Sequence, residues 1–346
     1  MGTEDKRLQL IEHWLRAQLG WPLDRLEPAS ADASFRRYFR AFGRDGSTRV
    51  VMDAPPDKED LGPYLKVAGL LERCDVHVPQ LDAVDLERGL ILQEDLGTVP
   101  LLAQLRNGGD PSHLYGEALN SLARIQRQSG PLVAALAPYD RTALMREMAL
   151  MPEWFCARHL RLPQDPRRDA LLATTMDFLV REMISQPVVL VHRDYHSRNL
   201  MVTPFRAPGI IDFQDALAGP IAYDLVSLLK DCYIAWPRAQ VEAWVRGYRA
   251  HLAAAGVDVA SDDSEFLRWF DLAGLQRHIK VLGIFARLWY RDGKRAYLAD
   301  LPLTLEYVRD CAHRYAELAD FAHWVEATLV PALPLANERE HGVSVH

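Results

Sequence analysis

Hydrophobic residues in the first 95 positions fall into the short, alternating runs that are typical of β-strands. Gly43-Arg44-Asp45-Gly46 and Glu87-Arg88-Gly89 are turn signals between such runs. The flanking strands are expected at residues 36–42, 49–52, 81–84 and 90–93. Apolar residues at helical spacing predict one helix over residues 8–19 and a second from about residue 57 to Arg73. This part of the chain therefore favours a small sheet with one inserted helix.

After Gly97 the apolar spacing changes to that of amphipathic helices. The helices are expected at residues 114–128, 141–159, 170–184, 222–233, 239–254, 265–291 and 303–328. Only residues 188–212 interrupt this pattern with strand-like runs. We expect an α+β fold of two lobes. These are a β-rich N-terminal lobe over residues 1–95, a larger helical lobe over 96–334, and a polar, flexible tail over 335–346.

The strand-like interruption carries three polar side chains in a distinctive order. Val188–Val191 leads into a loop with Asp194, and Asn199 follows five positions later. Asp212 follows thirteen positions after Asn199, at the end of an expected hairpin. Any one of them alone would be read as a loop-capping residue. Together they match a kinase site, in which an aspartate holds the attacking hydroxyl and the other two hold magnesium on the phosphates.

Four neighbouring polar residues have roles that the pattern leaves partly open. His192 is expected to pack and to hydrogen-bond the loop backbone rather than act as a base. Arg198 either stabilises the transferring phosphoryl group or is a solvated loop charge, and His196 lies in the same loop. Asp224 begins a helix, where it either interacts with the helix dipole or hydrogen-bonds the catalytic loop.

Composition and charge exclude several other classes of protein. The 346 residues carry a net charge of −7, which argues against a general nucleic-acid surface. The four cysteines are scattered without a C-x-x-C pair, so neither a zinc site nor a disulfide framework is indicated. No apolar run approaches the roughly 18 residues of a membrane span, and the N-terminus lacks the pattern of a signal peptide. A cytoplasmic monomer is expected.

The order H-x-D-x-x-x-x-N, then I-D-F, then Y-D-L, resembles the aminoglycoside phosphotransferase and choline kinase superfamily, whose members are small-molecule kinases of protein-kinase-like fold. The resemblance extends from about residue 26 to about residue 329. Further segments are similar to one bacterial branch, the anomeric kinases of N-acetylmuramate and N-acetylglucosamine in cell-wall sugar recycling. These segments are Ala33–Arg40, Val51–Pro56, Gln93–Gly97, Ile211–Ala216 and Tyr223–Tyr233.

The resemblance implies ATP and Mg²⁺ as cofactors and phosphorylation of the sugar C1 hydroxyl. It implies that Asp194 is the base and that Asn199 and Asp212 are metal ligands. The hinge that bonds adenine would include Gln93, Glu94 and Leu96. Residues 31–36 would cover the phosphates, and the expected contacts there are Ser34, Phe35 and Arg36.

Two features depart from the usual kinase pattern. The phosphate-covering loop, Ala31-Asp32-Ala33-Ser34, contains no glycine. Met52 stands on the strand where the resemblance implies a phosphate-binding lysine, so the usual Lys–Glu ion pair is not expected. Four basic residues are candidates to replace that lysine, and the sequence does not choose among them: Arg36, Arg37, Arg40 and Lys58.

The acceptor site is expected from residues that follow the catalytic segment. Aromatic faces stack on sugar rings, and a basic side chain can pair with the lactyl carboxylate of N-acetylmuramate. The candidates are His196, Gln214, Asp231, Tyr233, Arg277 and Lys280. Arg277 and Lys280 share a helix face because they lie three residues apart. The alternative is a purely structural role, in which the aromatic residues belong to the core and the charged residues form a solvated face.

Two other functions compete with the sugar kinase. The same fold would serve a kinase for another hydroxyl compound, such as an aminoglycoside, choline or homoserine. Cationic acceptors would need an acidic pocket, and the basic residues on the long helix argue against them. The second alternative is a nucleotide-binding pseudokinase scaffold, suggested by Met52 and the glycine-free loop. The joint presence of Asp194, Asn199 and Asp212 argues against that alternative.

Overall fold

The computed structural model describes residues 5–31 and 35–341. The chain divides into two compact units. The first contains Met1–Asp110 together with Arg198–Asp215, and the second contains Pro111–Ser197 and Ala216–His346. The division therefore crosses the catalytic segment, with Asp194 in the second unit and both expected metal ligands in the first.

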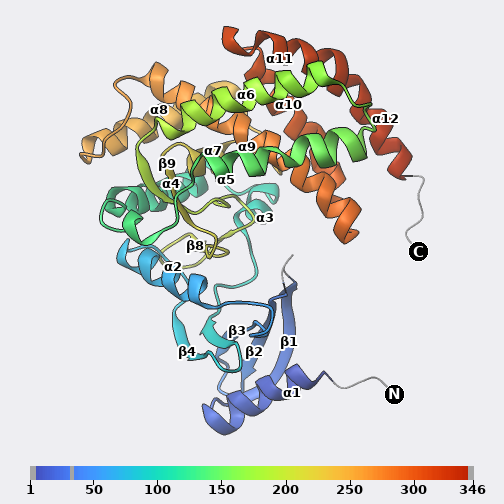
Figure 1. Ribbon diagram of the computed structural model, residues 1–346. Helices are drawn as coiled ribbons and strands as arrows, with labels where there is room; N and C mark the ends of the chain where they lie inside the picture. The colour runs from blue at the N-terminus through green and yellow to red at the C-terminus, as the bar shows by residue number, and fades with distance from the viewer. Residues whose placement is uncertain (1–4, 32–34, 342–346) are drawn as a thin grey trace. The chain divides into compact units, whose positions relative to one another are not determined.

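The first unit is built on a five-stranded antiparallel sheet with the order β1-β2-β3-β5-β4 (Figure 1). Its strands are β1 (Leu23–Ala31), β2 (Arg37–Gly43), β3 (Thr48–Asp53), β4 (Leu81–Asp85) and β5 (Leu90–Glu94). Helix α1 (Lys6–His13) and the π-helical turn η1 (Trp14–Gln18) bury Ile11, Trp14 and Leu15 in one cluster with strand residues such as Val51 and Leu92. Burial of these apolar side chains fixes the helix to the sheet.

Two short strands from a distant part of the chain join this unit. They are β7 (Leu200–Met201) and β8 (Gly209–Ile210), which pair with each other. Val202 N–H donates to the carbonyl of Val99, and Ile210 N–H donates to the carbonyl of His77. These bonds attach residues 198–215 to the chain on either side of β4 and β5, since His77 precedes β4 and Val99 follows β5. Helices α2 (Gly62–Arg73) and α3 (Leu101–Arg106) complete the unit.

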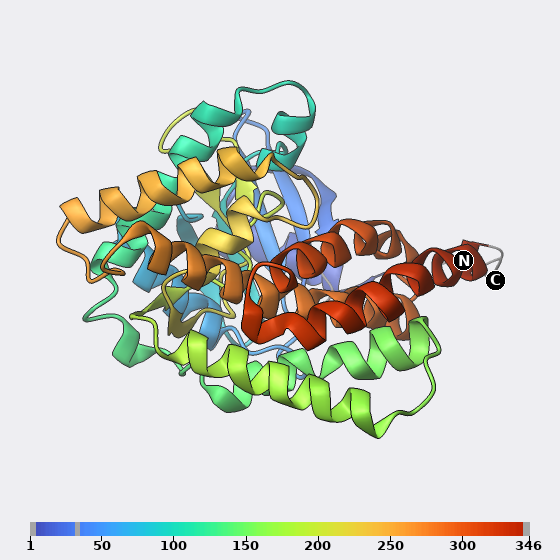
Figure 2. The same cartoon turned by 90° about the horizontal axis from the view of Figure 1, so that it is seen from above.

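The second unit is mainly helical (Figure 2). A two-stranded sheet within it pairs β6 (Val188–Val191) with β9 (Leu217–Pro220) in antiparallel orientation. The α-helices are α4 (Pro111–Gln128), α5 (Arg141–Met148), α6 (Pro166–Ile184), α7 (Tyr223–Leu229), α8 (Arg238–Ala254), α9 (Asp263–Asp292), α10 (Leu301–Ala312), α11 (Ala319–Trp324) and α12 (Val330–His341). Short 3₁₀ or π segments are η2 (Val133–Ala135), η3 (Met151–His159), η4 (Arg295–Asp300), η5 (Ala316–Leu318) and η6 (Val325–Leu329).

Helix α9 is the centre of this unit. It contacts α5, α6, α7, α8 and α10, and the whole run from Phe270 to Gly283 is buried. Asp262 caps its start by accepting from the N–H groups of Ser264 and Glu265, at 2.8 and 2.9 Å. Gly293, with a φ of +67°, ends it. A helix buried on all sides can hold charged side chains only where other groups compensate them.

The expected fold class is confirmed, since an antiparallel sheet is followed by a largely helical region. Strand β1 was not predicted, because Pro28 and alternating charges hide the pattern of this edge strand. The helix expected over residues 303–328 is broken into α10, η5, α11 and η6. The compact units also divide the chain differently from the expected lobes, 1–95 and 96–334.

The segment after Pro334 is helical to His341, instead of the polar tail expected from the sequence. Ala336 and Glu340 are buried, and the indole N–H of Trp289 donates to Glu340 at 2.9 Å. These contacts explain why a proline-containing polar stretch is ordered. Among the described residues, no helix is long and apolar enough to cross a membrane.

Gly283 allows α9 to pack closely on the chain between α5 and η3. A Cβ at this position would lie 2.4 Å from the carbonyl carbon of Leu150, whereas one at Gly274 would meet Val226 at an ordinary 3.4 Å. We expect Gly283→Ala to lower the free energy of unfolding by roughly 2 kcal/mol or more, because backbone must shift. Gly274→Ala should be neutral or stabilising by up to about 1 kcal/mol. Urea denaturation measures both, and equal effects would contradict this packing.

Candidate functional site

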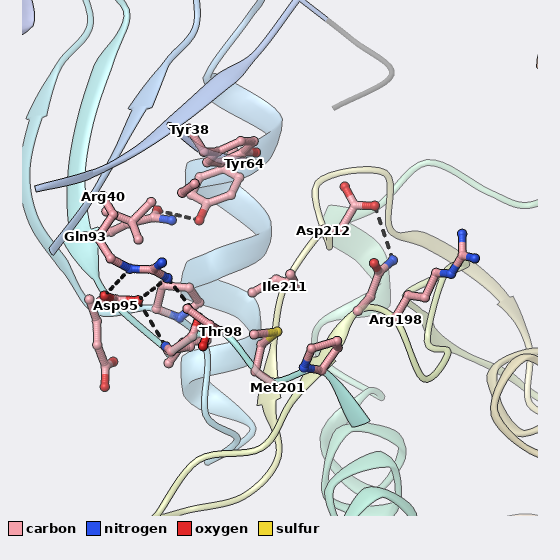
Figure 3. Close-up of a pocket in the computed structure, with 18 residues that line it drawn as sticks. Tyr38, Arg40, Tyr64, Gln93, Asp95, Thr98, Arg198, Met201, Ile211 and Asp212 are labelled. Carbon is pink, nitrogen blue, oxygen red and sulfur yellow. Dashed lines mark hydrogen bonds and ion pairs between the residues drawn. The ribbon is translucent and has the colours of Figure 1, made fainter. Parts of the chain in front are cut away.

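The first unit contains a cavity of about 510 Å³ (Figure 3). This volume is in the range of sites that hold a whole small molecule. Gln93, Glu94 and Leu96, the expected hinge residues, line one part of it. Arg198, Asn199 and Asp212 line another part, and Figure 3 shows Ile211 and Met201 between these two polar ends. An apolar centre with polar groups at both ends suits a nucleotide, which has an apolar base face and charged phosphates.

Two side-chain interactions hold the hinge end of this cavity. Arg40 donates to both carboxylate oxygens of Asp95, at 2.7 and 3.0 Å, and Gly97 N–H donates to the same group at 3.0 Å. Burial alone would raise the pKa of Asp95, but these donors outweigh it and lower that pKa. Nearby, the hydroxyl of Tyr64 donates to Gln93 Oε1 at 2.6 Å. The backbone of residues 94–97 is therefore held in a fixed conformation.

At the other end, two oxygen-bearing side chains lie in contact. Asn199 Nδ2 donates to Asp212 Oδ2 at 3.2 Å, and Gln214 Nε2 donates to Asp212 Oδ1 at 2.8 Å. Asp212 has a φ of +62°, an uncommon conformation for a residue other than glycine and one that clusters at functional sites. The described residues contain no group of three or more His, Cys, Asp or Glu that could hold a metal. An amide and a carboxylate oxygen still fit Mg²⁺, which takes few protein ligands and fills its other positions with phosphates and water.

The second unit has its own smaller cavity, of about 140 Å³. It is lined by Asp194 and His196 from the loop after β6 and by Arg277 and Lys280 from α9. Its remaining wall is formed by Tyr223, Cys232, Tyr233, Val281, Ile284, Phe285, Leu288 and Tyr297. The volume is too small for a whole drug-sized molecule, so the cavity can hold only part of one.

Two buried carboxylates hold the loop that carries Asp194. Asp224 accepts from the backbone N–H groups of His192 and Arg193, at 2.6 and 3.0 Å. Asp231 accepts from the backbone N–H of Ser197 at 3.0 Å and from its hydroxyl. Burial raises the pKa of Asp224 to about 6, so this carboxylate is ionised at neutral pH and both oxygens accept. Residues 192–197 are thus held at both ends.

Positive charges surround the carboxylate of Asp194. Burial alone would raise its pKa, but Lys280, Arg277 and Arg193, together with His196 when it is protonated, lower the pKa of Asp194 to about 2. Burial lowers the pKa of His196, whose Nδ1 is enclosed and has no hydrogen-bond partner among the described residues. A neutral imidazole and an ionised carboxylate therefore face the same small cavity.

Glu147 of α5 compensates two of these cations. Lys280 Nζ lies 3.2 Å from Glu147 Oε1 and donates to the hydroxyl of Tyr223 at 3.2 Å. Arg193 and the hydroxyl of Tyr139 also donate to Glu147. Burial alone would raise the pKa of Glu147, but Lys280 and Arg193 lower it. This network fixes the ends of Lys280 and Arg193 beside the catalytic loop.

The structure brings most of the predicted residues together in two groups. Gln93, Glu94, Leu96, Arg198, Asn199 and Asp212 line the first cavity. Asp194, His196, Tyr233, Arg277 and Lys280 line the second. Gln214 lines neither and contacts Asp212 instead, while Asp231 is buried under the loop. Asp224 bonds the loop backbone, as the second of its two interpretations anticipated, and His192 Nδ1 accepts from the backbone N–H of Asp194.

The expected phosphate-covering residues do not join the first cavity. Ser34 lies outside the described residues. Phe35 is exposed and lies under Lys58, whose Nζ is 4.8 Å from the ring centroid. Arg36 is buried but is not part of the cavity wall. Met52 is fully buried between Tyr38 and Ile91 in the sheet, so β3 presents no basic group there.

Two of the four candidates for the missing lysine have other partners. Arg37 binds Asp53 and Asp5, and Arg40 binds Asp95 at the hinge. Sequence reasoning missed Glu147, Tyr223 and Cys232. Glu147 lies on α5, Tyr223 begins α7, and Cys232 lies in the turn after α7. No local motif marks them, because only packing around α9 brings them to Asp194. The pair of Arg40 and Asp95 could not be found from sequence spacing either, since 55 positions separate its members.

Residues 25–261 match the model of a phosphotransferase enzyme family. An N-acetylmuramate/N-acetylglucosamine kinase of Pseudomonas putida is 43% identical over 336 residues, covering 94% of this chain and 97% of the relative. The enzyme of the same name from Neisseria meningitidis serogroup B is 48% identical over 294 residues, covering 84% and 86%.

Solved structures show the same fold at low sequence identity. Plasmodium vivax ethanolamine kinase has a TM-score of 0.61 at 13% identity, covering 89% of this chain and 90% of that protein. A GDP complex of aminoglycoside 2'-phosphotransferase-IIIa has a TM-score of 0.60 at 15% identity, covering 88% and 99%. The choline kinase LicA of Streptococcus pneumoniae has a TM-score of 0.57 at 11% identity, covering 88% and 99%.

The interactions of Glu147 should make the free energy of unfolding depend on pH. Because its pKa is lowered from 4.5 in the folded protein, Glu147 stabilises the fold above that pH, and this contribution is lost as the pH falls through the folded-state value. Glu147→Gln should lower the free energy of unfolding by roughly 3–5 kcal/mol at pH 7, since two cations lose their partner. The difference from wild type should shrink below pH 4.5. Denaturation at several pH values measures it.

Glu153, an exposed residue of η3, supplies the matched control. Glu153→Gln should leave the denaturation midpoint almost unchanged at every pH. A Glu147→Gln variant as stable as wild type at pH 7 would show that the network does not stabilise the fold.

Proposed function

Because the chain belongs to the phosphotransferase enzyme family, we propose that it transfers the γ-phosphoryl group of ATP to the C1 hydroxyl of N-acetylmuramate and N-acetylglucosamine. The observation that carries this proposal is the close relationship, over most of both chains, to enzymes named for those two sugars. The product would be a sugar α-1-phosphate for peptidoglycan recycling towards UDP-sugars. The reaction would take place in the cytoplasm, in keeping with four free, buried cysteines, and the protein would act as a monomer.

The proposed acceptor end of the reaction is in the second unit. Asp194 would accept a hydrogen bond from the C1 hydroxyl and take its proton as the bond to phosphorus forms. A carboxylate with a pKa of about 2 is a weak base, but it is fully ionised and well placed to orient the hydroxyl. An anomeric hydroxyl is more acidic than an ordinary alcohol, so orientation and late proton transfer suffice.

Two other groups of this cavity suit a sugar. His196 lines the cavity, so its imidazole is placed to exchange a hydrogen bond with a sugar hydroxyl or amide. The ring of Tyr233 packs edge-to-face on that imidazole, with 5.5 Å between centroids, and adds an aromatic surface to the wall. Arg277 and Lys280 make the same wall unfavourable for a cationic acceptor such as choline or an aminoglycoside.

The proposed nucleotide end is in the first unit. The backbone of Glu94 and Leu96 would bond adenine, with Ile211 and Met201 against the ring faces. Asn199 and Asp212 would hold magnesium, which when bound offsets negative charge on the β- and γ-phosphates. Arg198 would contact the transferring phosphoryl group from the adjacent loop position.

The alternative of a non-catalytic nucleotide-binding scaffold is favoured by one observation, the buried Met52 on β3. It predicts binding of ATP without turnover. Incubation of the protein with ATP, magnesium and a panel of amino sugars separates the two functions. We expect a phosphorus NMR signal coupled to the anomeric proton for N-acetylmuramate and N-acetylglucosamine. A C6 phosphate, or no sugar product at all, would rule the proposal out.

The role of Asp194 can be tested by a single substitution. Asp194→Asn should keep the fold and the affinity for ATP while lowering kcat at least a hundredfold, because the group that orients the hydroxyl and takes its proton is lost. Steady-state kinetics and a thermal-shift titration with ATP measure the two effects. Asp177→Asn is the control and should retain full turnover, because Asp177 is a partly exposed ion-pair partner of Arg141 and Arg181. Near-normal kcat in Asp194→Asn would show that this residue is not the base.

A further inference from the structure

Arg277 differs from the other cations around Asp194 in its charge compensation. Lys280 and Arg193 both pair with Glu147. Arg277 is 4% exposed, yet it forms no ion pair with any carboxylate of the described chain. A buried cation without a counter-ion is costly, since its hydration is lost and nothing replaces it. The acceptor cavity therefore contains one charge that the protein itself leaves without a direct partner.

The contacts of Arg277 leave part of its guanidinium available. Nε donates to Ser227 Oγ at 2.7 Å, and Nη1 lies 3.6 Å from Cys232 Sγ. Both partners are neutral side chains. Nη2 makes no hydrogen bond to a described residue, and it is not among the nitrogens that the protein encloses without a partner. Since Arg277 lines the acceptor cavity, its remaining N–H donors face that space.

The surroundings favour an anionic ligand with two oxygens. Next to Arg277 on α9, Val281, Ile284 and Phe285 make the cavity wall apolar, so the field of the guanidinium is weakly screened. A planar guanidinium binds carboxylates through two parallel hydrogen bonds, which a lysine cannot reproduce. Lys280 is less suited for a second reason, because Glu147 already offsets its charge.

We propose that Arg277 binds the lactyl carboxylate of N-acetylmuramate and makes the enzyme select this acid over the neutral N-acetylglucosamine. The inference rests on the proposed function. N-acetylmuramate differs from N-acetylglucosamine by the lactyl ether, which carries its only carboxylate. One buried cation near the catalytic base is therefore enough to separate the two acceptors. Arg277 acts on binding of the acid, while Asp194 handles the hydroxyl of either sugar.

The experiment compares three acceptors with matched enzyme variants. The acceptors are N-acetylmuramate, its carboxamide of nearly equal size, and N-acetylglucosamine. Wild type should have a higher kcat/KM for the acid than for the carboxamide. Arg277→Gln should lower kcat/KM for all three acceptors to some extent, because the charge of Arg277 also acts on Asp194. Its loss on the acid should exceed its loss on the other two on the order of tenfold to a hundredfold, mainly through KM. Arg277→Lys should give an intermediate loss on the acid.

Lys280→Gln is the matched control on the same helix face. Because Lys280 acts on Asp194 and Glu147, this variant should lower turnover of all three acceptors by a similar factor. Retained turnover of N-acetylglucosamine by Arg277→Gln, with an unchanged melting temperature, would show that the variant is folded.

Two results would overturn the proposal. Equal loss on all three acceptors in folded Arg277→Gln would mean that Arg277 acts on Asp194 or on the phosphoryl group instead. Equal kcat/KM of wild type for the acid and its carboxamide would overturn it without any variant. If wild type phosphorylates none of the three acceptors, that result would instead contradict the proposed function itself.

Discussion

The position of the proposed base depends on one buried carboxylate. Asp224 accepts from two consecutive backbone N–H groups, those of His192 and Arg193, and so fixes the backbone that leads into Asp194. Arg193 has a φ of +76° within this turn, a conformation that an arginine rarely adopts without such restraint. Asp231 holds the other end of the loop through Ser197. Loss of the Asp224 bonds would free the turn, and the carboxylate of Asp194 would lose its orientation.

Charge compensation around this loop is arranged in two layers. Glu147 lies behind the cavity wall and balances Lys280 and Arg193, whereas the cavity itself presents Asp194, Lys280 and Arg277. The long helix α9 can carry these charges through the core because partners from α5 and α7 meet it there. The same arrangement keeps Asp194 ionised and gives the acceptor cavity a basic character. Close packing at Gly283 fixes the helix that supplies both cations.

Much of the framework could be predicted from local patterns. The strands around the two turn signals, the long helices and the order of Asp194, Asn199 and Asp212 all follow from apolar spacing and motif spacing. Arg277 and Lys280 could be placed on one helix face from their separation alone. The partners of these residues could not be predicted, because Glu147 and Tyr223 approach them only when distant helices pack. Strand β1 and the helical end of the chain were missed because burial there overrides a weak, proline-containing local pattern.

The central claim is that the acceptor is the C1 hydroxyl of an amino sugar held at Asp194. The most direct measurement offers the protein, with ATP and magnesium, two forms of N-acetylglucosamine that each lack one hydroxyl. One is blocked at C1 as its methyl α-glycoside, and the other is deoxygenated at C6. We predict ADP release with the 6-deoxy sugar and none with the methyl glycoside. Turnover of the methyl glycoside without turnover of the 6-deoxy sugar would contradict the assignment of C1.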